Sequence, residues 1–599
     1  MEGGAKLVRL LLASLLGAGL AGAPLLVPAT APQNQEAPEM KTEETKETFT
    51  VRAQRNEVLL RVVVRDAKGN AVGGLAKDDF RLSDNGKPQT VTAFSVEHYK
   101  ATAAGEAPAP PAATAKPAAP SEAAPVPALA QRYVAFYFDD LVVAAEDLVR
   151  TRQAAERYIA SSMQPSDRAG IFTSSGLGVL DLTDDRAKLR EALARLQPHP
   201  RTLPAEHDCP PLTPYEAYLI DEAHDPIMLQ IAIWEVAACA CGGSLHQCAR
   251  AQDQAQMAAR MAWAQDQDQS RQSLHVLANL VRRLGSLPGQ RSILWLSPGF
   301  LALELKPDLD QLVDSALREH VVISALDARG LWVDIPGGEA SEQNILKFST
   351  LDEKGSSGID PSMFARLAMY RKTGKNMNDD VMAQVTHDTG GVFVHDTNDY
   401  DGGFRMAGGL PECSYLLAFA PQDLKYDGKF HKLKVELVNA RGWSVQARNG
   451  YFAPNEALRP EERARQEIED AVYSREEYRQ FPVEVQTQFF KLGGTEARLS
   501  VTAHVDARAM HFHKEGDRNR LNLKMVCAAF DRDGNLIDGT QRNIDLLLRD
   551  STLAHVMSAG LNVGGQLKVG VGTYALRVVV YEIDSGRMTA LNRTVEIPF

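Results

Sequence analysis

The residues best placed for chemistry are two adjacent carboxylates, Asp139 and Asp140, which directly follow an apolar run. Ser297 has the equivalent place after a second apolar run, and Thr202 closes the loop after a helical stretch. In an open parallel sheet, ligands bind outside the carboxyl ends of the strands, near the point where the strand order reverses. If both runs belong to one sheet, these four side chains form a binding rim at one edge. The commoner alternative is that the two aspartates cap the following helix or bind loop amides.

Cysteines form the second notable group, because four of the six fall within residues 203–270. These four are Cys209, Cys239, Cys241 and Cys248. In an oxidising compartment such a cluster predicts one or two disulfides that hold a helical insertion together. A bridge from Cys209 to Cys239 or Cys241 is favoured, although four cysteines allow three full pairings.

A zinc site is the alternative use of this cluster, with His207 or His246 as an added ligand. The cysteines on either side of Ala240 lack the spacing of a zinc finger, so disulfides are favoured over zinc. The remaining cysteines, Cys413 and Cys527, are isolated in the sequence and are expected to be free or buried.

Two further polar clusters contain residue types that bind metals. The stretch from Asp396 to Gly402 is rich in oxygen ligands, but its spacing does not fit an EF-hand loop, and a capped turn before a helix is expected. His511 and His513 share one face if they lie on a strand, and such pairs are usually surface residues. The chain has no Gly-x-Ser-x-Gly elbow, no Walker loop and no His-Glu-x-x-His motif, so we expect that it is not an enzyme.

The elements that position the rim are four apolar runs that alternate with amphipathic helical stretches. Runs that are apolar on both faces and alternate with helices are typical of a parallel sheet covered on each side. We therefore expect a doubly wound α/β domain over residues 131–412, with the cysteine-containing insertion inside it. The apolar runs are residues 133–138, 169–173, 292–296 and 321–326.

Segments with β patterns flank this domain. Residues 48–99 and 413–453 each look too short to fold alone, so we hypothesise that 48–99 packs with 414–453 as one sandwich. Residues 454–482 are charged and predict a helical connector. Residues 483–599 carry short strands punctuated by turns, which is typical of an Ig-like β-sandwich. The expected fold class is α/β plus β.

Residues 1–31 have the layout of a secretory signal peptide, since Lys6 and Arg9 precede an apolar run that is followed by small residues. Residues 32–47 are polar and predict a tether, and residues 100–130 are rich in Ala and Pro and predict an extended linker. No later stretch is long and apolar enough to cross a bilayer. We expect a secreted, periplasmic or cell-envelope protein that is not an integral membrane protein after cleavage.

Length, composition and net charge limit the kinds of partner that can be expected for this chain. The 599 residues are too many for one core, and their 44% hydrophobic and 24% charged fractions are those of ordinary globular domains. The formal net charge is −12, and no run of Lys and Arg forms a surface that could follow a phosphate backbone. Nucleic acid is therefore excluded as the expected partner.

The order of elements resembles that of a von Willebrand factor type A (VWA) domain, and more narrowly the chain resembles the VWA-related proteins of Acidobacteria. The likeness covers nearly the whole chain after the signal peptide. It implies a VWA-type core flanked by β-sandwich regions. The segments that carry it are Val64-Arg-Asp-Ala-Lys-Gly-Asn70, Asp78-Asp-Phe80, Phe138-Asp-Asp-Leu141, Leu182-Thr-Asp-Asp185, Pro288-Gly-Gln-Arg-Ser292, Ser297-Pro-Gly-Phe300, Ile323-Ser-Ala-Leu-Asp-Ala-Arg-Gly330, Thr389-Gly-Gly391, Asp427-Gly-Lys-Phe-His-Lys-Leu433 and Arg448-Asn-Gly-Tyr451.

VWA domains hold a divalent cation through an Asp-x-Ser-x-Ser loop, a distant Thr and a distant Asp. Here Asp139 matches the first Asp and Thr202 the Thr. Leu141 and Val143 stand at the two Ser positions, and Ser297 or Pro298 stands where the later Asp belongs. Mg²⁺, the cation such a site would hold, needs more hard oxygen ligands than this set supplies. The resemblance therefore implies a degenerate adhesion site that is expected to be unoccupied, with no cofactor. The less favoured alternative is a Mg²⁺ ion held by Asp139 and Thr202.

The resemblance implies a protein-binding, adhesion or envelope scaffold role for an exported chain, with a protein partner that the sequence does not identify. The rival hypothesis is a secreted or periplasmic hydrolase that uses Asp139 and Asp140 as acid and base groups. A third hypothesis is a purely architectural envelope component with a vestigial site.

Overall fold

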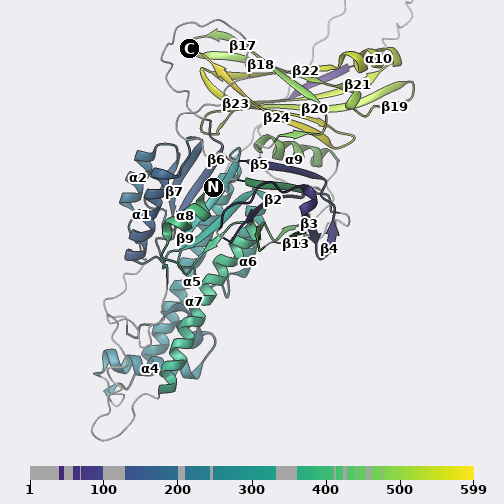
Figure 1. Ribbon diagram of the computed structural model, residues 1–599. Helices are drawn as coiled ribbons and strands as arrows, with labels where there is room; N and C mark the ends of the chain where they lie inside the picture. The colour runs from purple at the N-terminus through teal and green to yellow at the C-terminus, as the bar shows by residue number, and fades with distance from the viewer. Residues whose placement is uncertain are drawn as a thin grey trace, which may run out of the picture. The chain divides into compact units, whose positions relative to one another are not determined.

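The computed structural model (Figure 1) describes residues 40–45, 58–67, 69–98, 129–199, 209–242, 247–331, 361–409, 413–421, 428–439, 442–453, 460–474 and 477–598. Within these ranges the chain has a mixed architecture of ten α-helices and five β-sheets, so the fold class is α/β plus β. The expected signal peptide and the Ala/Pro-rich linker up to residue 128 lie outside the described residues.

A six-stranded sheet forms the centre of the α/β part, in the order β11-β10-β9-β6-β7-β8. All its neighbouring pairs are parallel except β7 with β8, which is antiparallel. The chain proceeds from β6 to β7 and β8 on one side and then returns through β9 to the other side, so the strand order reverses between β6 and β9. The strands are β6 (Arg132–Phe138), β7 (Asp167–Thr173), β8 (Leu180–Thr183), β9 (Gln290–Ser297), β10 (Val321–Asp327) and β11 (Phe393–Val394).

Helices cover both faces of this sheet, which explains why its strands are apolar on both sides. Along β6, Tyr133, Ala135 and Tyr137 pack on one face with α5, α6 and α7, whereas Val134, Phe136 and Phe138 pack on the other with α1, α2 and α8. The bounds are α1 (Ala145–Ser161), α2 (Arg186–Arg195), α5 (Ala251–Gly285), α6 (Lys306–Arg318), α7 (Pro361–Thr389) and α8 (Tyr400–Gly408).

A helical lobe extends beyond the sheet and is built from α3 (Pro214–Asp221), α4 (Pro226–Ala240) and the amino-terminal halves of α5 and α7 (Figure 1). Its core includes Trp263 of α5 and Tyr370 of α7. Proline at the first turn and a side-chain cap start both short helices, with Thr213 capping α3 and Asp225 capping α4.

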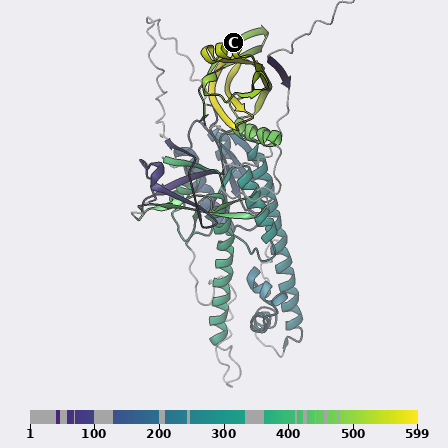
Figure 2. The same cartoon turned by 90° about the vertical axis from the view of Figure 1, so that its right-hand side faces the viewer.

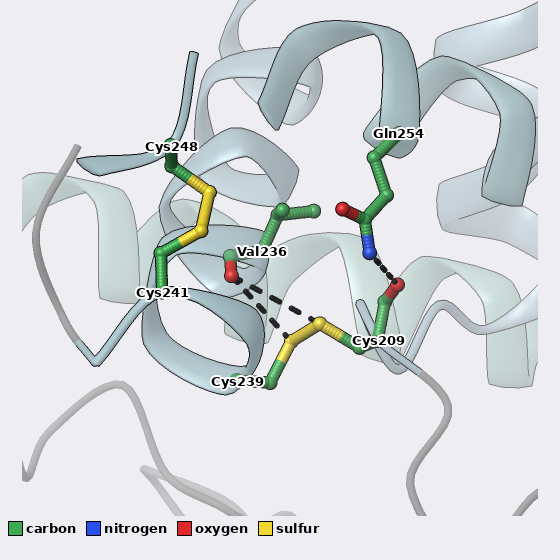
Figure 3. The surroundings of a disulfide bond; sticks show 6 residues. All are labelled: Cys209, Val236, Cys239, Cys241, Cys248 and Gln254. Atoms are coloured by element: carbon green, nitrogen blue, oxygen red, sulfur yellow. Dashed lines mark hydrogen bonds between the residues drawn. A yellow bond between two sulfur atoms is a disulfide. The ribbon is translucent and has the colours of Figure 1, made fainter. Parts of the chain in front are cut away.

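Two disulfides close this lobe, as the sequence indicates. Cys209 is bonded to Cys239, which is one of the two favoured bridges, and Cys241 is bonded to Cys248 (Figure 3). The Gln254 amide of α5 donates to the Cys209 carbonyl at 3.3 Å, so the first bridge is also fastened to the long helix. Disulfides are compatible with a secreted protein.

Two four-stranded sheets share one core and combine the two β segments that flank the α/β part. In the first sheet β12 pairs with both β2 and β5, and in the second β13 pairs with β3. The two segments expected to pack together are therefore joined by backbone pairing. The strands are β2 (Val58–Arg65), β3 (Phe80–Asp84), β4 (Lys87–Gln89), β5 (Ala93–His98), β12 (Cys413–Phe419), β13 (Phe430–Leu437), β14 (Ser444–Gln446) and β15 (Gly450–Phe452).

The C-terminal part contains a seven-stranded and a three-stranded sheet around one apolar core, and its strands curve around a common axis (Figure 2). The strands are β1 (Met40–Thr45), β16 (Tyr478–Arg479), β17 (Val483–Gly493), β18 (Glu496–Val505), β19 (His513–Glu515), β20 (Arg518–Phe530), β21 (Leu536–Leu548), β22 (Leu561–Gly570), β23 (Gly572–Glu582) and β24 (Arg587–Ile597). Two helices accompany them, α9 (Pro460–Tyr473) and α10 (Asp550–Ala559).

The structure changes two of the expectations for this region. Residues 40–45, expected as part of the tether, form β1, which pairs antiparallel with β21. Within the expected connector, α9 packs Ile468 and Val472 against Val526 and Val579 of the seven-stranded sheet. Among the described residues no helix combines the length and the apolar character needed to cross a membrane.

Candidate functional site

Asp139 lies where β6 ends, at the switch point of the strand order. Its side chain is fully buried, and its backbone amide donates to the Leu296 carbonyl of the neighbouring strand β9 at 2.9 Å. One carboxyl oxygen, Oδ2, accepts from the Ser297 hydroxyl at 2.9 Å and from the Ser273 hydroxyl at 3.0 Å. The structure therefore brings Asp139 and Ser297 into direct contact, as the topology predicts.

The second oxygen of Asp139, Oδ1, is buried and has no hydrogen-bond partner. Burial raises the pKa of the Asp139 carboxyl to about 6, although the neighbouring hydroxyl groups of Ser174, Ser297 and Ser273 act against the rise. A carboxyl group with one unsatisfied oxygen in an apolar surrounding favours its neutral form. Asp139 thus changes its charge close to neutral pH.

Asp140 has a different environment, because both of its carboxylate oxygens accept hydrogen bonds from the protein. Oδ1 accepts from the Ser174 hydroxyl at 3.0 Å and from the Ser175 amide at 2.9 Å. Oδ2 accepts from the Ser175 hydroxyl at 2.6 Å and from His199 Nδ1 at 2.9 Å. Asp140 therefore anchors the loop that follows β7 and the segment that follows α2, and it serves loop donors as the commoner interpretation of an acidic pair expects.

The loop after β9 is also fixed by this cluster. The Gly299 amide donates to the Ser297 hydroxyl at 3.0 Å, so the hydroxyl that binds Asp139 also holds the turn. Gly299 has a φ of +75°, and a Cβ there would lie 2.4 Å from the Asn378 carbonyl of α7. Only glycine satisfies both the left-handed backbone and this close approach.

A third strand of the sheet, β10, ends in another buried carboxylate. Asp327 accepts from Arg329 Nε at 2.9 Å and from its Nη2 at 3.0 Å. The same guanidinium contacts Asp379 of α7, and Lys375 donates to Asp379 at 2.8 Å. This carboxylate is therefore neutralised by a network of side chains.

The structure shows what stands at the positions where a VWA domain would hold a cation. Leu141 and Val143, at the positions where VWA domains have serines, are buried apolar residues, and Val143 belongs to the core of the sheet. Thr202, and likewise His207 and His246 of the zinc alternative, lie outside the described residues. In the part of the chain that the structure describes, no group of three or more His, Cys, Asp or Glu is arranged to hold a metal ion.

Sequence reasoning missed several members of the cluster. Ser174 and Ser175 could have been found, since they directly follow β7 at the same edge of the sheet. Ser273 lies on α5 and His199 follows α2, and their approach to the aspartates depends on how the helices pack, which residue types alone do not reveal.

The other residues singled out from the sequence lie away from this edge. Asp399 accepts from the Gly402 amide at 2.8 Å and caps α8, which is the capped turn expected there. His511 lies before β19 and His513 within it, so the two do not share one strand. Cys413 and Cys527 are free and buried.

Comparisons with known proteins give a structural likeness only. No family model and no curated protein matches the chain. Among solved structures, the chain is similar to the conserved hypothetical protein BatB from Bacteroides thetaiotaomicron at 10% sequence identity, with a TM-score of 0.19, over 46% of this chain and 95% of that one.

Proposed function

We propose that the chain is an exported binding protein whose α/β domain is of the VWA type and captures a protein partner at the carboxyl edge of its central sheet, without a resident cation. The proposal rests on how the aspartates are used. Asp140 accepts four hydrogen bonds from the protein, and Asp139 accepts two hydroxyls at its Oδ2. Hydroxyl and amide donors thus hold the loops together where a metal ion would otherwise do so.

Exposed apolar side chains in the loops at this edge support partner binding. Leu177 and Val179, in the loop after β7, are 54% and 47% exposed. Leu303 follows β9 with 38% exposure, and Leu331 follows β10 with 54%. Because β10, β9 and β7 are parallel strands of one sheet, these loops emerge at the same edge. Apolar side chains that gather in one exposed patch rimmed by polar residues are typical of interaction sites, whereas single scattered ones are ordinary.

A pull-down from envelope extract tests this function, using the purified chain immobilised on beads. The variant Leu177→Ser/Leu303→Ser should lose the captured partner, whereas Val149→Ser, which changes a side chain 40% exposed on α1, should retain it. Treatment with a chelator should leave capture unchanged. Release of the partner by the chelator, or equal loss with Val149→Ser, would contradict a metal-free apolar rim.

The hydrolase hypothesis remains as the second candidate because the buried Asp139 carboxyl leaves its Oδ1 without a hydrogen-bond partner, and burial raises its pKa to about 6. A carboxyl that titrates near neutrality is suited to general acid or base chemistry. Chromogenic ester, glycoside and peptide substrates should be offered to the wild type and to Asp139→Asn. Turnover by the wild type that Asp139→Asn abolishes would favour the enzyme, and no turnover would favour the binding protein.

A further inference from the structure

The strand β17 forms a long edge of the C-terminal β part. It spans eleven residues, Val483–Gly493, and lies at one end of the three-stranded sheet β17-β18-β22. On one side it pairs antiparallel with β18, and no other strand among the described residues pairs with its second side. That second side presents backbone amide and carbonyl groups to which a further strand can bond.

Most of β17 is exposed on both faces of the sheet. Near its beginning the strand meets the seven-stranded sheet, because the Thr589 hydroxyl of β24 accepts from the Phe481 amide at 3.2 Å. Beyond that point, all residues from 486 to 493 are exposed. Phe489 lies opposite Leu499 of the apolar core and therefore on the core side of the sheet, yet it is 39% exposed. An aromatic side chain on the core side is thus left without a cover.

Other strands at the margins of the described sheets have features that discourage pairing with another chain. The strands β11 and β16 have two residues each, and β4 has three and contains Pro88, which has no backbone amide to donate. In contrast, β17 has no proline, and its residues from Val485 to Phe490 are all uncharged. A long edge strand without such protection is prone to pair with a strand of another molecule.

The sequence of β17 is nearly symmetrical about Thr487, since it reads Val-Gln-Thr-Gln-Phe from Val485 to Phe489. If a second copy lies antiparallel with Thr487 opposite Thr487, Val485 lies opposite Phe489 and Gln486 opposite Gln488. Pairs of a β-branched with an aromatic residue, and pairs of threonines, stabilise neighbouring antiparallel strands. The apolar pairs then meet on the core side and the amide pairs on the outer face. The strand is therefore complementary to itself.

The charges near the two ends of β17 also fit an antiparallel pair. With Thr487 on a two-fold axis, Glu484 of one copy lies at the same end of the pair as Lys491 of the other. A parallel arrangement would instead bring like charges to the same end, which is unfavourable. A two-fold axis makes one strand supply both halves of the contact, as in most homodimers.

We propose that β17 binds β17 of a second copy of this chain, antiparallel and with Thr487 opposite Thr487. The two three-stranded sheets then become one continuous sheet, and Phe489 of each copy is covered by Val485 of the other. This contact does not involve the rim at the carboxyl edge and does not depend on the function proposed there. One strand pair is small beside the roughly 1,600 Å² that a standard interface buries, so we expect a dimer that dissociates on dilution.

Sedimentation velocity of the full chain over a concentration series from about 1 to 100 μM tests the proposal. The wild type should pass from monomer to dimer within this series. Thr487→Lys and Thr487→Asp should each raise the dissociation constant about tenfold or more, because two like charges then face each other at the axis. An equimolar mixture of the two variants should recover the dimer, since an ammonium group then faces a carboxylate.

Thr594→Lys is the matched control, because Thr594 is an exposed threonine of another strand, β24, and the added charge is the same. This variant should dimerise as the wild type does. Thr487 is itself exposed, so its variants should keep the circular dichroism spectrum of the wild type. The proposal is overturned if the wild type stays monomeric at the highest concentration, or if both Thr487 variants dimerise as the wild type does. It is equally overturned if their mixture stays monomeric, or if Thr594→Lys weakens the dimer to the same extent.

Discussion

The two edges of the central sheet use charge in opposite ways. At the carboxyl edge, the aspartates that follow β6 receive donors from the protein itself. At the amino edge, six arginines are among the described residues that line a cavity of about 580 Å³. At the edge where α/β proteins usually bind ligands, the protein itself satisfies every oxygen of the two aspartates except Asp139 Oδ1, whereas the cavity lies at the other edge. The presence of charged residues alone therefore does not show which edge takes a ligand.

The largest expected effect is at Asp140. Asp140→Ala should lower the free energy of unfolding by about 3 kcal/mol, because it leaves buried hydroxyl and amide donors without their acceptor. Denaturant unfolding followed by tryptophan fluorescence measures this change. Asp181→Ala is the control, since that carboxylate is 64% exposed and should change stability by about 0.5 kcal/mol or less. A similar small change at Asp140 would mean that the carboxyl edge is not held by this residue.

The next largest effect is a pH dependence of the free energy of unfolding that originates at Asp139. Its pKa is raised in the folded state, so the folded chain binds the proton more tightly than the unfolded chain, and stability falls as pH rises from about 4 to 6. Over this window the loss should be about 2–3 kcal/mol. Asp139→Asn should remove this part of the slope.

A second buried carboxyl must be separated from this effect. Burial raises the pKa of Asp266 to about 7, so Asp266 contributes a slope of the same sign that extends to higher pH. Asp266→Asn should therefore flatten the profile between pH 6 and 7 and leave the Asp139 contribution below pH 6 in place. An unchanged profile in Asp139→Asn would contradict the assignment.

The smallest effect is expected at the apolar loops of the carboxyl edge. Leu177→Ser and Leu303→Ser should each change the free energy of unfolding by about 0.5 kcal/mol or less, because both side chains are exposed. Thermal unfolding of the single variants checks this. A large loss of stability would mean that these side chains support the fold, and their role in partner capture would need another test.

The sequence predicts the central sheet well, because buried parallel strands leave continuous apolar runs and carboxyl ends must meet at one edge. The contact between Asp139 and Ser297 follows from that rule. The contact of Ser273 with Asp139 cannot be predicted from this rule, because the register of α5 against β6 depends on packing. The cavity at the amino edge cannot be predicted from the sequence for the same reason, since Arg61 and Arg593 are brought together only by the arrangement of several sheets. Thr202 lies outside the described residues and stays a prediction.

The pairing of β1 with β21 has a consequence for the order of folding. Met40 lies opposite Leu546 and Thr45 opposite Gln541, so a strand near the beginning of the chain completes a sheet made about 500 residues later. During synthesis this early segment has no docking place until β21 has emerged. Contacts of such sequence separation form late and slowly. The sheet edge at β21 consequently stays uncovered until β1 docks there, and an interruption of synthesis before β21 would leave the early strand without a partner.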